Sequence, residues 1–211
     1  MDTQGDYRLA WEKLHQKSLN PFDQETANPW VVELESRGQI RGAVLDAGCG
    51  AGHNALYLAE KGYPTTGFDI SSHAIDRAKE KALERGSKAQ FFQVDLCHLT
   101  GHDAEFDTVV DIGCFHSVVD SLTEQAQDDF VASLHRACRS GAGLFLRCLS
   151  ERNRELHPDW HGPAVSEQQI RRAFLQGWRI DELRCEVISL PELRDANMTV
   201  DVWFAHVSRV S

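Results

Sequence analysis

Residues 43–56 read A-V-L-D-A-G-C-G-A-G-H-N-A-L, and the rest of the fold follows from this stretch. A short apolar run ends in Asp46, glycines follow at positions 48, 50 and 52, and a helical pattern begins after them. Glycine lets the backbone adopt positive φ and lets a ligand approach where a Cβ would clash. The start of the next helix offers unpaired N–H groups and the positive end of the helix dipole. The stretch therefore predicts a strand, a turn and a helix that hold a nucleotide-like ligand.

The composition is typical of one soluble domain. The chain has 211 residues, of which 42% are hydrophobic and 26% charged, enough for one substantial core. No apolar run approaches the roughly 20 residues that span a bilayer, and the N-terminus lacks a secretory pattern, so we expect a cytoplasmic protein. The net charge of −10 disfavours nucleic acid and anionic membranes as partners, because both would be repelled.

The cysteines and histidines do not predict a metal site. The six cysteines form no C-x-x-C pair and no secreted disulfide spacing, so buried reduced thiols are expected. The nearest approaches to ligand spacing are Cys97-His98, Cys114-x-His116 and His157-x3-His161. Pro158 interrupts the last of these, and no H-E-x-x-H occurs.

Strand-like and helical patterns alternate along the chain. The strand patterns lie at 43–45, 65–70, 91–95, 106–112, 144–149, 178–190 and 199–210. Helices are expected after the first, second, fourth and fifth of these strands, and the last two strands follow each other without one. This order predicts a doubly wound, Rossmann-like α/β fold, with a mostly parallel seven-stranded sheet and a C-terminal antiparallel hairpin.

Two local patterns refine this interpretation. Ser121-x-x-Glu124 reads as a capping box for a helix that Gly141 ends. Residues 113–116, G-C-F-H, read as the loop after the fourth strand.

Three segments are expected to differ in role. Residues 31–211 form the single main domain. Residues 1–30, with spaced aromatics that include Trp11 and Phe22, form an N-terminal arm that packs on the domain as a helix or folds over the ligand crevice as a lid. Residues 150–165 form an irregular insertion on the side where a substrate would bind, either as a surface loop or as a substrate cap.

Four acids lie at or near the carboxyl ends of the predicted strands: Asp46, Asp69, Asp95 and Asp111. Ligands of doubly wound sheets bind at this edge. Asp69 follows Asp46 at about the 20-residue offset at which an acid meets ribose hydroxyls, and a carboxylate accepts two hydrogen bonds from such a diol.

The ligand is not expected to carry a pyrophosphate. His53 stands where the dinucleotide fingerprint needs a third glycine, and no G-K-[ST] follows the glycines. Carboxylates crowding the crevice would repel phosphate and would suit a cofactor with cationic groups.

With these motifs the sequence resembles class I S-adenosylmethionine-dependent methyltransferases. The matching stretches are D-A-G-C-G-A-G, G-F-D-I, Q-V-D-L, F-D-T-V-V-D-I-G-C-F-H, and the terminal G-W-R-I and V-W-F-A-H-V. V-V-D-I-G-C-F-H is most similar to bacterial small-molecule enzymes of the thiol, thiopurine and heterocyclic-toxin type. Ile112 and Cys114 depart from the pattern of that group, so the substrate environment can differ.

The resemblance implies S-adenosyl-L-methionine as cofactor and assigns residues to it. The loop with Gly48, Cys49, Gly50 and Gly52 would hold the methionine part, with Asp46 close to it. Asp69 would bind the ribose, with Ile70 against the adenine. The adenine amino group would donate to Asp95, and Leu96 would pack on the ring.

The expected reaction is in-line transfer of the methyl group to sulfur, nitrogen or oxygen of a small aromatic, heterocyclic or thiol-bearing molecule. Such a displacement mostly needs orientation and a dry site. His116 is the candidate catalytic base or substrate orienter, unless it only bonds its own loop. Asp111 is a second catalytic candidate, unless it only supports the cofactor.

The candidate substrate-binding residues are Trp11, Phe22, Phe115, His116, Arg147 and Trp160. Two alternatives remain: a cyclisation-type reaction on the same fold, and a non-catalytic partner subunit. The chain is expected to be a monomer or a homodimer.

Overall fold

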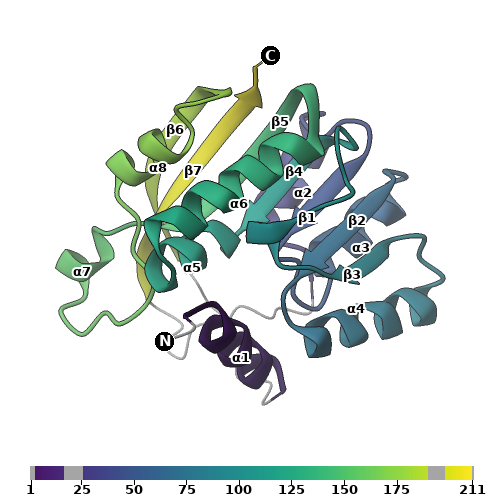
Figure 1. Cartoon of the computed structure of the whole chain (residues 1–211), viewed down its shortest axis with the longest axis horizontal. Helices are drawn as coiled ribbons and strands as arrows, with labels where there is room; N and C mark the ends of the chain where they lie inside the picture. Colours follow the sequence, from purple (N-terminus) through teal and green to yellow (C-terminus); the bar gives the residue numbers. More distant parts are fainter. Residues whose placement is uncertain (1–2, 17–25, 190–197, 211) are drawn as a thin grey trace.

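The computed structural model of the chain describes residues 3–16, 26–189 and 198–210. Seven strands form one sheet in the order β3-β2-β1-β4-β5-β7-β6, with helices on both faces (Figure 1). The strands are β1 (Val44–Ala47), β2 (Thr65–Asp69), β3 (Gln90–Gln93), β4 (Phe106–Ile112), β5 (Cys138–Leu149), β6 (Trp178–Ser189) and β7 (Thr199–Arg209). The predicted α/β fold is confirmed.

The first five strands are parallel, and β7 runs antiparallel to both β5 and β6. The strand order reverses beside β1, where the chain goes first to β2 and β3 and then returns to β4. Such a switch point opens a crevice at the carboxyl ends of the strands.

Nine helices lie in the described part of the chain. They are α1 (Thr3–Gln16), α2 (Pro29–Ser36), α3 (His53–Glu60), α4 (Ser72–Arg85), the 3-10 helix η1 (Leu96–His98), α5 (Cys114–Ser121), α6 (Glu124–Ala137), α7 (Asn153–Leu156) and α8 (Glu167–Ala173). α6 and α8 lie in front of the sheet and α2 and α3 behind it, while α1 lies below the lower ends of the strands (Figure 1).

The core follows from the sequence patterns of these elements. The β1 residues are buried throughout, as expected for a central parallel strand. The larger buried cluster joins Phe115 of α5, Phe130 of α6 and Ile170 of α8 to the front of the sheet. A second cluster joins Trp30 of α2 to Phe145 and other residues behind it.

Two local predictions were wrong. Residues 114–121 form helix α5 rather than a loop, and Ser121 is its last residue. The cap of α6 is Thr123, whose hydroxyl accepts a hydrogen bond from the N–H of Ala126 at 3.3 Å. α6 ends at Ala137, before Gly141, because β5 begins at once at Cys138.

The 150–165 insertion contains more order than its sequence indicates. It includes α7 and a parallel bridge between Ser150 and Val165. Buried Asn153 ties it to the hairpin, since its amide group donates to the carbonyl oxygens of Ser150 and Asp201 at 2.9 and 2.8 Å. The insertion is therefore fixed to the end of β7.

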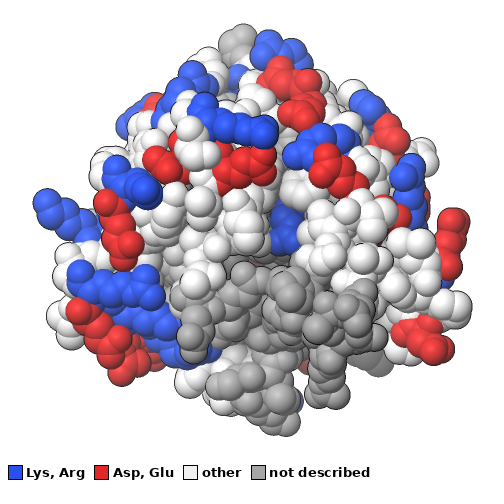
Figure 2. Space-filling view, turned by 180° about the vertical axis from the view of Figure 1, so that it is seen from behind, with Lys and Arg blue, Asp and Glu red and all other residues white. Residues whose placement is uncertain are grey.

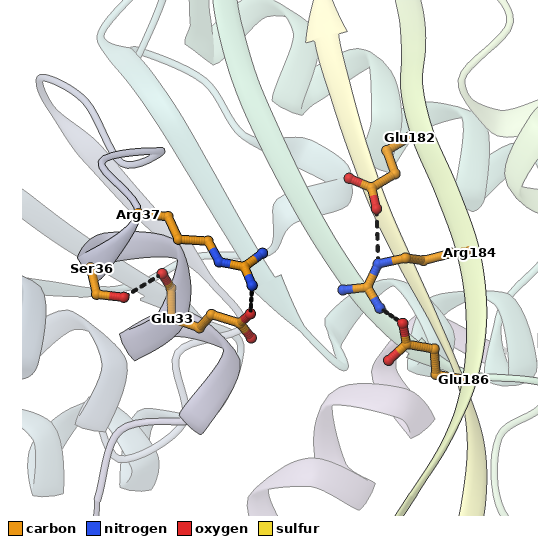
Figure 3. Close-up of polar contacts among 6 residues, drawn as sticks. All are labelled: Glu33, Ser36, Arg37, Glu182, Arg184 and Glu186. Atoms are coloured by element: carbon orange, nitrogen blue, oxygen red, sulfur yellow. Dashed lines mark hydrogen bonds and ion pairs between the residues drawn. The ribbon is translucent and has the colours of Figure 1, made fainter.

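Strand β6 is the edge of the sheet, and charged side chains follow its exposed face. Arg184 pairs with Glu182, at 2.9 Å, and with Glu186, and its guanidinium lies 4.4 Å from the ring centroid of Phe204 (Figure 3). α2 carries a similar exposed pair between Arg37 and Glu33 (Figure 3). Exposed pairs stabilise little, but charges on an edge strand oppose pairing with another chain.

Acidic and basic side chains are interspersed on the face seen from behind (Figure 2). Within the described ranges, no helix is both long enough and apolar enough to cross a membrane.

Candidate active site

A cavity of about 170 Å³ lies at the carboxyl ends of the parallel strands. Its lining follows the strand order from β3 to β7. In that order it includes Asp95, Asp69, Gly48, Cys114, Arg147 and Val202. Side chains of α1 and α5 complete the walls. The topology therefore gathers residues that are up to 154 positions apart in the sequence, from Gly48 to Val202, at the carboxyl ends of the parallel strands.

The glycine turn after β1 forms the floor of the cavity. Gly48 and Gly50 have φ of 69° and 53°, in the left-handed region that favours glycine. A Cβ on Gly48 would lie 2.6 Å from the Cβ of Cys114 and 2.8 Å from its Sγ. Close packing of the turn against α5 thus requires glycine at this position.

Asp69 at the end of β2 fixes the same turn. Its carboxylate accepts hydrogen bonds from the backbone N–H of Gly50 at 2.8 Å and of Ser71 at 2.9 Å. Burial raises the pKa of Asp69, while the bond from Ser71 and the nearby His15 oppose the rise. Each oxygen keeps a lone pair, so the carboxylate can accept a ligand hydroxyl as well.

Asp46 and Asp111 lie behind the lining rather than in it. Asp46 accepts a hydrogen bond from the N–H of Ala55 in α3 at 3.1 Å. Asp111 accepts from the N–H groups of Cys114 and Phe115 at 2.8 and 3.0 Å, and so holds the start of α5. Burial raises the pKa of each carboxyl to about 7.

Residues after β2 and β3 line the other end of the cavity. Ile70, Asp95 and Leu96, which the resemblance assigns to the adenine, are all part of the lining. Asp95 accepts from the N–H of Cys97 at 2.9 Å and lies 3.2 Å from His98 Nδ1. The Asp95 side chain is 32% exposed, whereas Asp69 is buried.

Helix α1 closes over this end. Glu12 accepts hydrogen bonds from the hydroxyls of Ser71 and Ser72 at the start of α4, at 2.7 and 3.0 Å. Tyr7, Trp11 and His15 of the same helix line the cavity. The helix is thus held at the place that a lid would occupy.

His116 lies where α5 meets the end of β5. Its Nδ1 accepts a hydrogen bond from the backbone N–H of Leu149 at 3.1 Å. The proton of the neutral ring is therefore assigned to Nε2. Burial and the charge of Arg147 lower the pKa of His116 to about 3, so the imidazole is neutral at physiological pH. His116 and Arg147 both line the cavity.

Four thiols contribute to the walls. Cys49, Cys97, Cys114 and Cys148 all line the cavity, and none is in a disulfide. Burial raises the pKa of all four, so they are neutral thiols. They act as small apolar groups, which agrees with the expectation of reduced cysteines.

Some predicted site residues lie elsewhere. Phe115 points into the core cluster and is fully buried, because it follows the first residue of α5 on the side facing α6. Trp160 packs against the rear cluster, and its indole N–H donates to the carbonyl oxygen of Pro163 at 3.2 Å. Gly52 is the N-cap of α3 and lies next to the ring of Phe91. Phe22 is outside the described residues.

The sequence did not single out Tyr7, His15 or His53 as site residues, yet all three line the cavity. His53 Nε2 lies 2.8 Å from Lys81 Nζ. Helical spacing of Tyr7, Trp11 and His15 at i, i+4 and i+8 was the available signal. No group of three or more potential metal ligands occurs in the part of the chain that the structure covers.

Comparison with protein families and known proteins agrees with this geometry. Residues 44–141 match the model of a methyltransferase domain. An uncharacterized methyltransferase of Schizosaccharomyces pombe is 41% identical over 131 residues, which are 62% of this chain and 88% of that protein. A 2-heptyl-1-hydroxyquinolin-4(1H)-one methyltransferase of Mycobacteroides abscessus is 36% identical over 77% of this chain and 70% of its own. An S-adenosyl-L-methionine-dependent Diels-Alderase of Talaromyces variabilis is 30% identical over 72% of this chain and 49% of its own.

Solved structures share the whole architecture. A protein studied for the conversion of a disulfide bond into a thioacetal group during echinomycin biosynthesis is 34% identical, with a TM-score of 0.78, over 90% of this chain and 84% of its own. The 1,6-didemethyltoxoflavin-N1-methyltransferase of Burkholderia thailandensis, with bound S-adenosylhomocysteine, is 18% identical and has a TM-score of 0.70 over 97% of this chain and 87% of its own.

Proposed function

The chain belongs to the S-adenosylmethionine-dependent methyltransferase family, and we propose that it methylates sulfur, nitrogen or oxygen of a small aromatic, heterocyclic or thiol-bearing molecule. One observation carries this proposal. The cavity joins Asp69 and Asp95 at one end to His116 and Arg147 at the other, where Cys148 and Leu149 also line it. A cofactor and a small second molecule can therefore meet inside it.

The chemistry of the lining residues supports S-adenosylmethionine as the cofactor. The turn contributes Gly48 and Gly50 to the cavity lining, where the missing side chains let a ligand approach the backbone. Asp69 retains lone pairs for a ribose diol. We assign Ile70 and Leu96 to the two faces of the adenine and Asp95 to its amino group, since all three line the same end of the cavity.

When bound, S-adenosylmethionine supplies a methyl group on a positively charged sulfur, and a nucleophile in line with the methyl–sulfur bond takes that group by displacement. The chain's own residues orient the nucleophile and keep water away from it. The side chains around this end are mostly apolar or neutral thiols, among them Ile112, Cys148 and Leu149. A weakly polar wall excludes water and strengthens the electrostatic interactions inside it.

We assign His116 the role of orienter rather than base. A base needs a free lone pair, but Nδ1 already accepts from Leu149 and Nε2 carries the proton. The neutral ring can instead donate a hydrogen bond to the acceptor molecule. Asp111 is assigned a supporting role, because its oxygens hold the first N–H groups of α5.

We further propose that residues 1–30 act as a lid. The contacts that support this are those of Glu12 with Ser71 and Ser72, and the presence of Trp11 in the cavity wall. Release of those contacts would open the end of the cavity where Asp69 lies. For residues 150–165, the role of a fixed surface loop is better supported than that of a substrate cap, since Trp160 packs against the core.

A cyclisation-type reaction is the second candidate, because the relatives include an S-adenosyl-L-methionine-dependent Diels-Alderase. The two are separated by incubating the protein with methyl-labelled cofactor and a panel of thiols, N-hydroxy heterocycles and ring nitrogens. Methyl transfer predicts label in at least one acceptor, together with S-adenosylhomocysteine. Tight cofactor binding with no labelled product would favour cyclisation or a non-catalytic role.

A further inference from the structure

Two side-chain amides line the cavity beside the glycine turn: Asn28, which precedes α2, and Asn54, in the first turn of α3. The backbone N–H of Asn28 donates a hydrogen bond to Oδ1 of Asn54 at 2.8 Å. The NH2 group of Asn54 in turn donates to the carboxyl of Asp46. Both ends of the Asn54 amide therefore have partners in the chain, and Asn54 fixes Asn28 at the start of α3.

Asn28 uses only one end of its own amide. Its Oδ1 accepts a hydrogen bond from the N–H of Trp30 at 3.0 Å and so caps α2. That bond identifies the other amide atom as the nitrogen Nδ2. Within the described ranges, Nδ2 donates to no group of the chain. Asn28 is 8% exposed and lines the cavity, so its NH2 group is a buried donor that a ligand can satisfy.

Capping of α2 alone does not require asparagine. Serine, threonine and aspartate cap helices about as well as asparagine does. Ser71, Thr123 and Ser166 cap α4, α6 and α8 in this chain. Asparagine differs from these residues in carrying an NH2 group beside the capping oxygen. The NH2 group of Asn28 is therefore the part of the side chain that capping leaves without a role.

The start of α3 adds a second donor next to Asn28. The N-cap of α3 is Gly52, which has no side chain to bond the first N–H groups of the helix. Asp46 accepts from the N–H of Ala55 at 3.1 Å. The N–H of Asn54 has no such acceptor among the residues that the structure covers. The first N–H groups of a helix attract anions, so Asn28 and Asn54 together present donors to a negatively charged group.

The amino-acid part of the proposed cofactor contains the group that suits these donors. It carries a carboxylate, which accepts hydrogen bonds, and an ammonium, which N–H donors would repel. Asp69, assigned above to the ribose, ends β2, and the glycine turn follows the neighbouring strand β1. A short saturated chain joins the amino-acid part to the ribose. That part therefore belongs at the glycine turn, beside which Asn28 lies.

Resting on the cofactor assignment in the proposed function, we propose that the NH2 group of Asn28 binds the carboxylate of the cofactor's methionine part, together with the backbone N–H of Asn54. Asn28 is then a cofactor-binding residue as well as the cap of α2. It selects ligands that carry the carboxylate over ligands that lack it.

The first test compares two ligands by titration calorimetry and needs no turnover. S-adenosylhomocysteine carries the carboxylate, and its decarboxylated analogue keeps the ammonium but lacks the carboxylate. Asn28→Ser retains an oxygen that caps α2 and removes the NH2 group. The variant should bind S-adenosylhomocysteine about tenfold more weakly and the decarboxylated analogue within about twofold of wild type. Urea unfolding of the variant checks that the cap of α2 is kept.

Asn28→Asp provides a stronger perturbation. It also keeps a capping oxygen, but it places a second carboxylate beside that of the ligand. Binding of S-adenosylhomocysteine should weaken about a hundredfold, while the decarboxylated, cationic analogue should bind at least as tightly as it does to wild type. Gln176→Glu adds the same charge at an exposed position outside the cavity lining and is the matched control. It should bind both ligands as the wild type does.

Two outcomes would overturn the assignment of Asn28. One is an equal loss of affinity for the two ligands, or no loss for S-adenosylhomocysteine, in the Asn28 variants. The other is that wild-type protein does not bind S-adenosylhomocysteine. Methyl transfer is judged separately by the label experiment. Absence of labelled product, with the expected difference between the two ligands, would refute the proposed reaction and support the role of Asn28.

Discussion

The Nδ1 atom of His116 accepts a hydrogen bond from the backbone N–H of Leu149 at 3.1 Å. This contact connects α5 to the end of β5 and assigns the ring proton to Nε2. It also removes the lone pair that general-base catalysis would need. The chemistry proposed for the acceptor end depends on this relationship.

His116→Asn tests whether His116 acts as a hydrogen-bond donor rather than as a base. Asparagine can accept from Leu149 but cannot reach as far as Nε2–H, so kcat/KM should fall about tenfold, as for the loss of one hydrogen bond. The pH profiles of wild type and variant, measured with one thiol, should have the same shape between pH 5 and 9. An acid limb that disappears in His116→Asn would show that the histidine titrates as a base.

Asp69→Asn should weaken binding of S-adenosylhomocysteine by roughly 2–3 kcal/mol, because charge-assisted hydrogen bonds to a ribose diol are lost. Titration calorimetry measures this directly. Asp103→Asn, which changes an exposed acid after η1, is the control and should bind as the wild type does. Equal affinity in Asp69→Asn would refute the ribose assignment.

Gly48→Ala should abolish cofactor binding and lower the free energy of unfolding by roughly 2–4 kcal/mol, since its Cβ would lie 2.6 Å from the Cβ of Cys114. Gly38→Ala is a matched control. Gly38 has nearly the same φ, 68° against 69°, but no atom within 4 Å of the added Cβ. Urea unfolding of both variants separates backbone strain from the steric contact. Equal losses would mean that the turn adapts to the added methyl group.

Glu12→Ala should speed the release of S-adenosylhomocysteine about fivefold, since hydrogen bonds of this kind stabilise by roughly 1 kcal/mol. Stopped-flow tryptophan fluorescence can follow the release, because Trp11 lines the cavity. Lys13→Ala, on the exposed side of α1, should leave the rate unchanged. The same release rate in Glu12→Ala and wild type would argue against a lid.

Asp46→Asn should change how stability depends on pH. The pKa of Asp46 is raised to about 7 in the folded state, above the 3.8 of an unperturbed carboxyl, so the folded state binds more protons between these values. Wild-type stability is therefore lost as pH rises from about 4 through 7, and the asparagine variant lacks this loss. The variant should gain on the order of 4 kcal/mol relative to wild type between pH 4 and pH 8 in urea unfolding without cofactor. Asp120→Asn, on the surface of α5, controls for the net charge. Parallel pH curves for Asp46→Asn and wild type would contradict the raised pKa.

The sequence predicted what depends on period and spacing. The strand patterns predict the sheet. The glycine turn and the number of residues between Asp46 and Asp69 predict one end of the cavity. The sequence could not predict the partner of His116, because Leu149 is 33 residues away and the contact depends on how α5 packs beside β5. It also missed the start of α5, since nothing local indicates that Asp111 would cap Cys114 and Phe115.

The role of α1 was open for a similar reason. A helix with aromatic residues can pack on a domain or cover a cavity, and the choice depends on contacts such as those between Glu12 and Ser71. Phe115 was predicted to bind the substrate, but it packs into the core. Its neighbour His116 faces the cavity, but the turn of the helix directs Phe115 into the core.

The most direct measurement of the central claim is a single turnover with methyl-labelled S-adenosylmethionine bound at one equivalent to excess protein. An acceptor from the panel of thiols and N-hydroxy heterocycles is then added. If the protein is a methyltransferase, label moves to the acceptor as S-adenosylhomocysteine forms in equal amount. Fully bound cofactor that keeps its label in the presence of every acceptor would contradict methyl transfer.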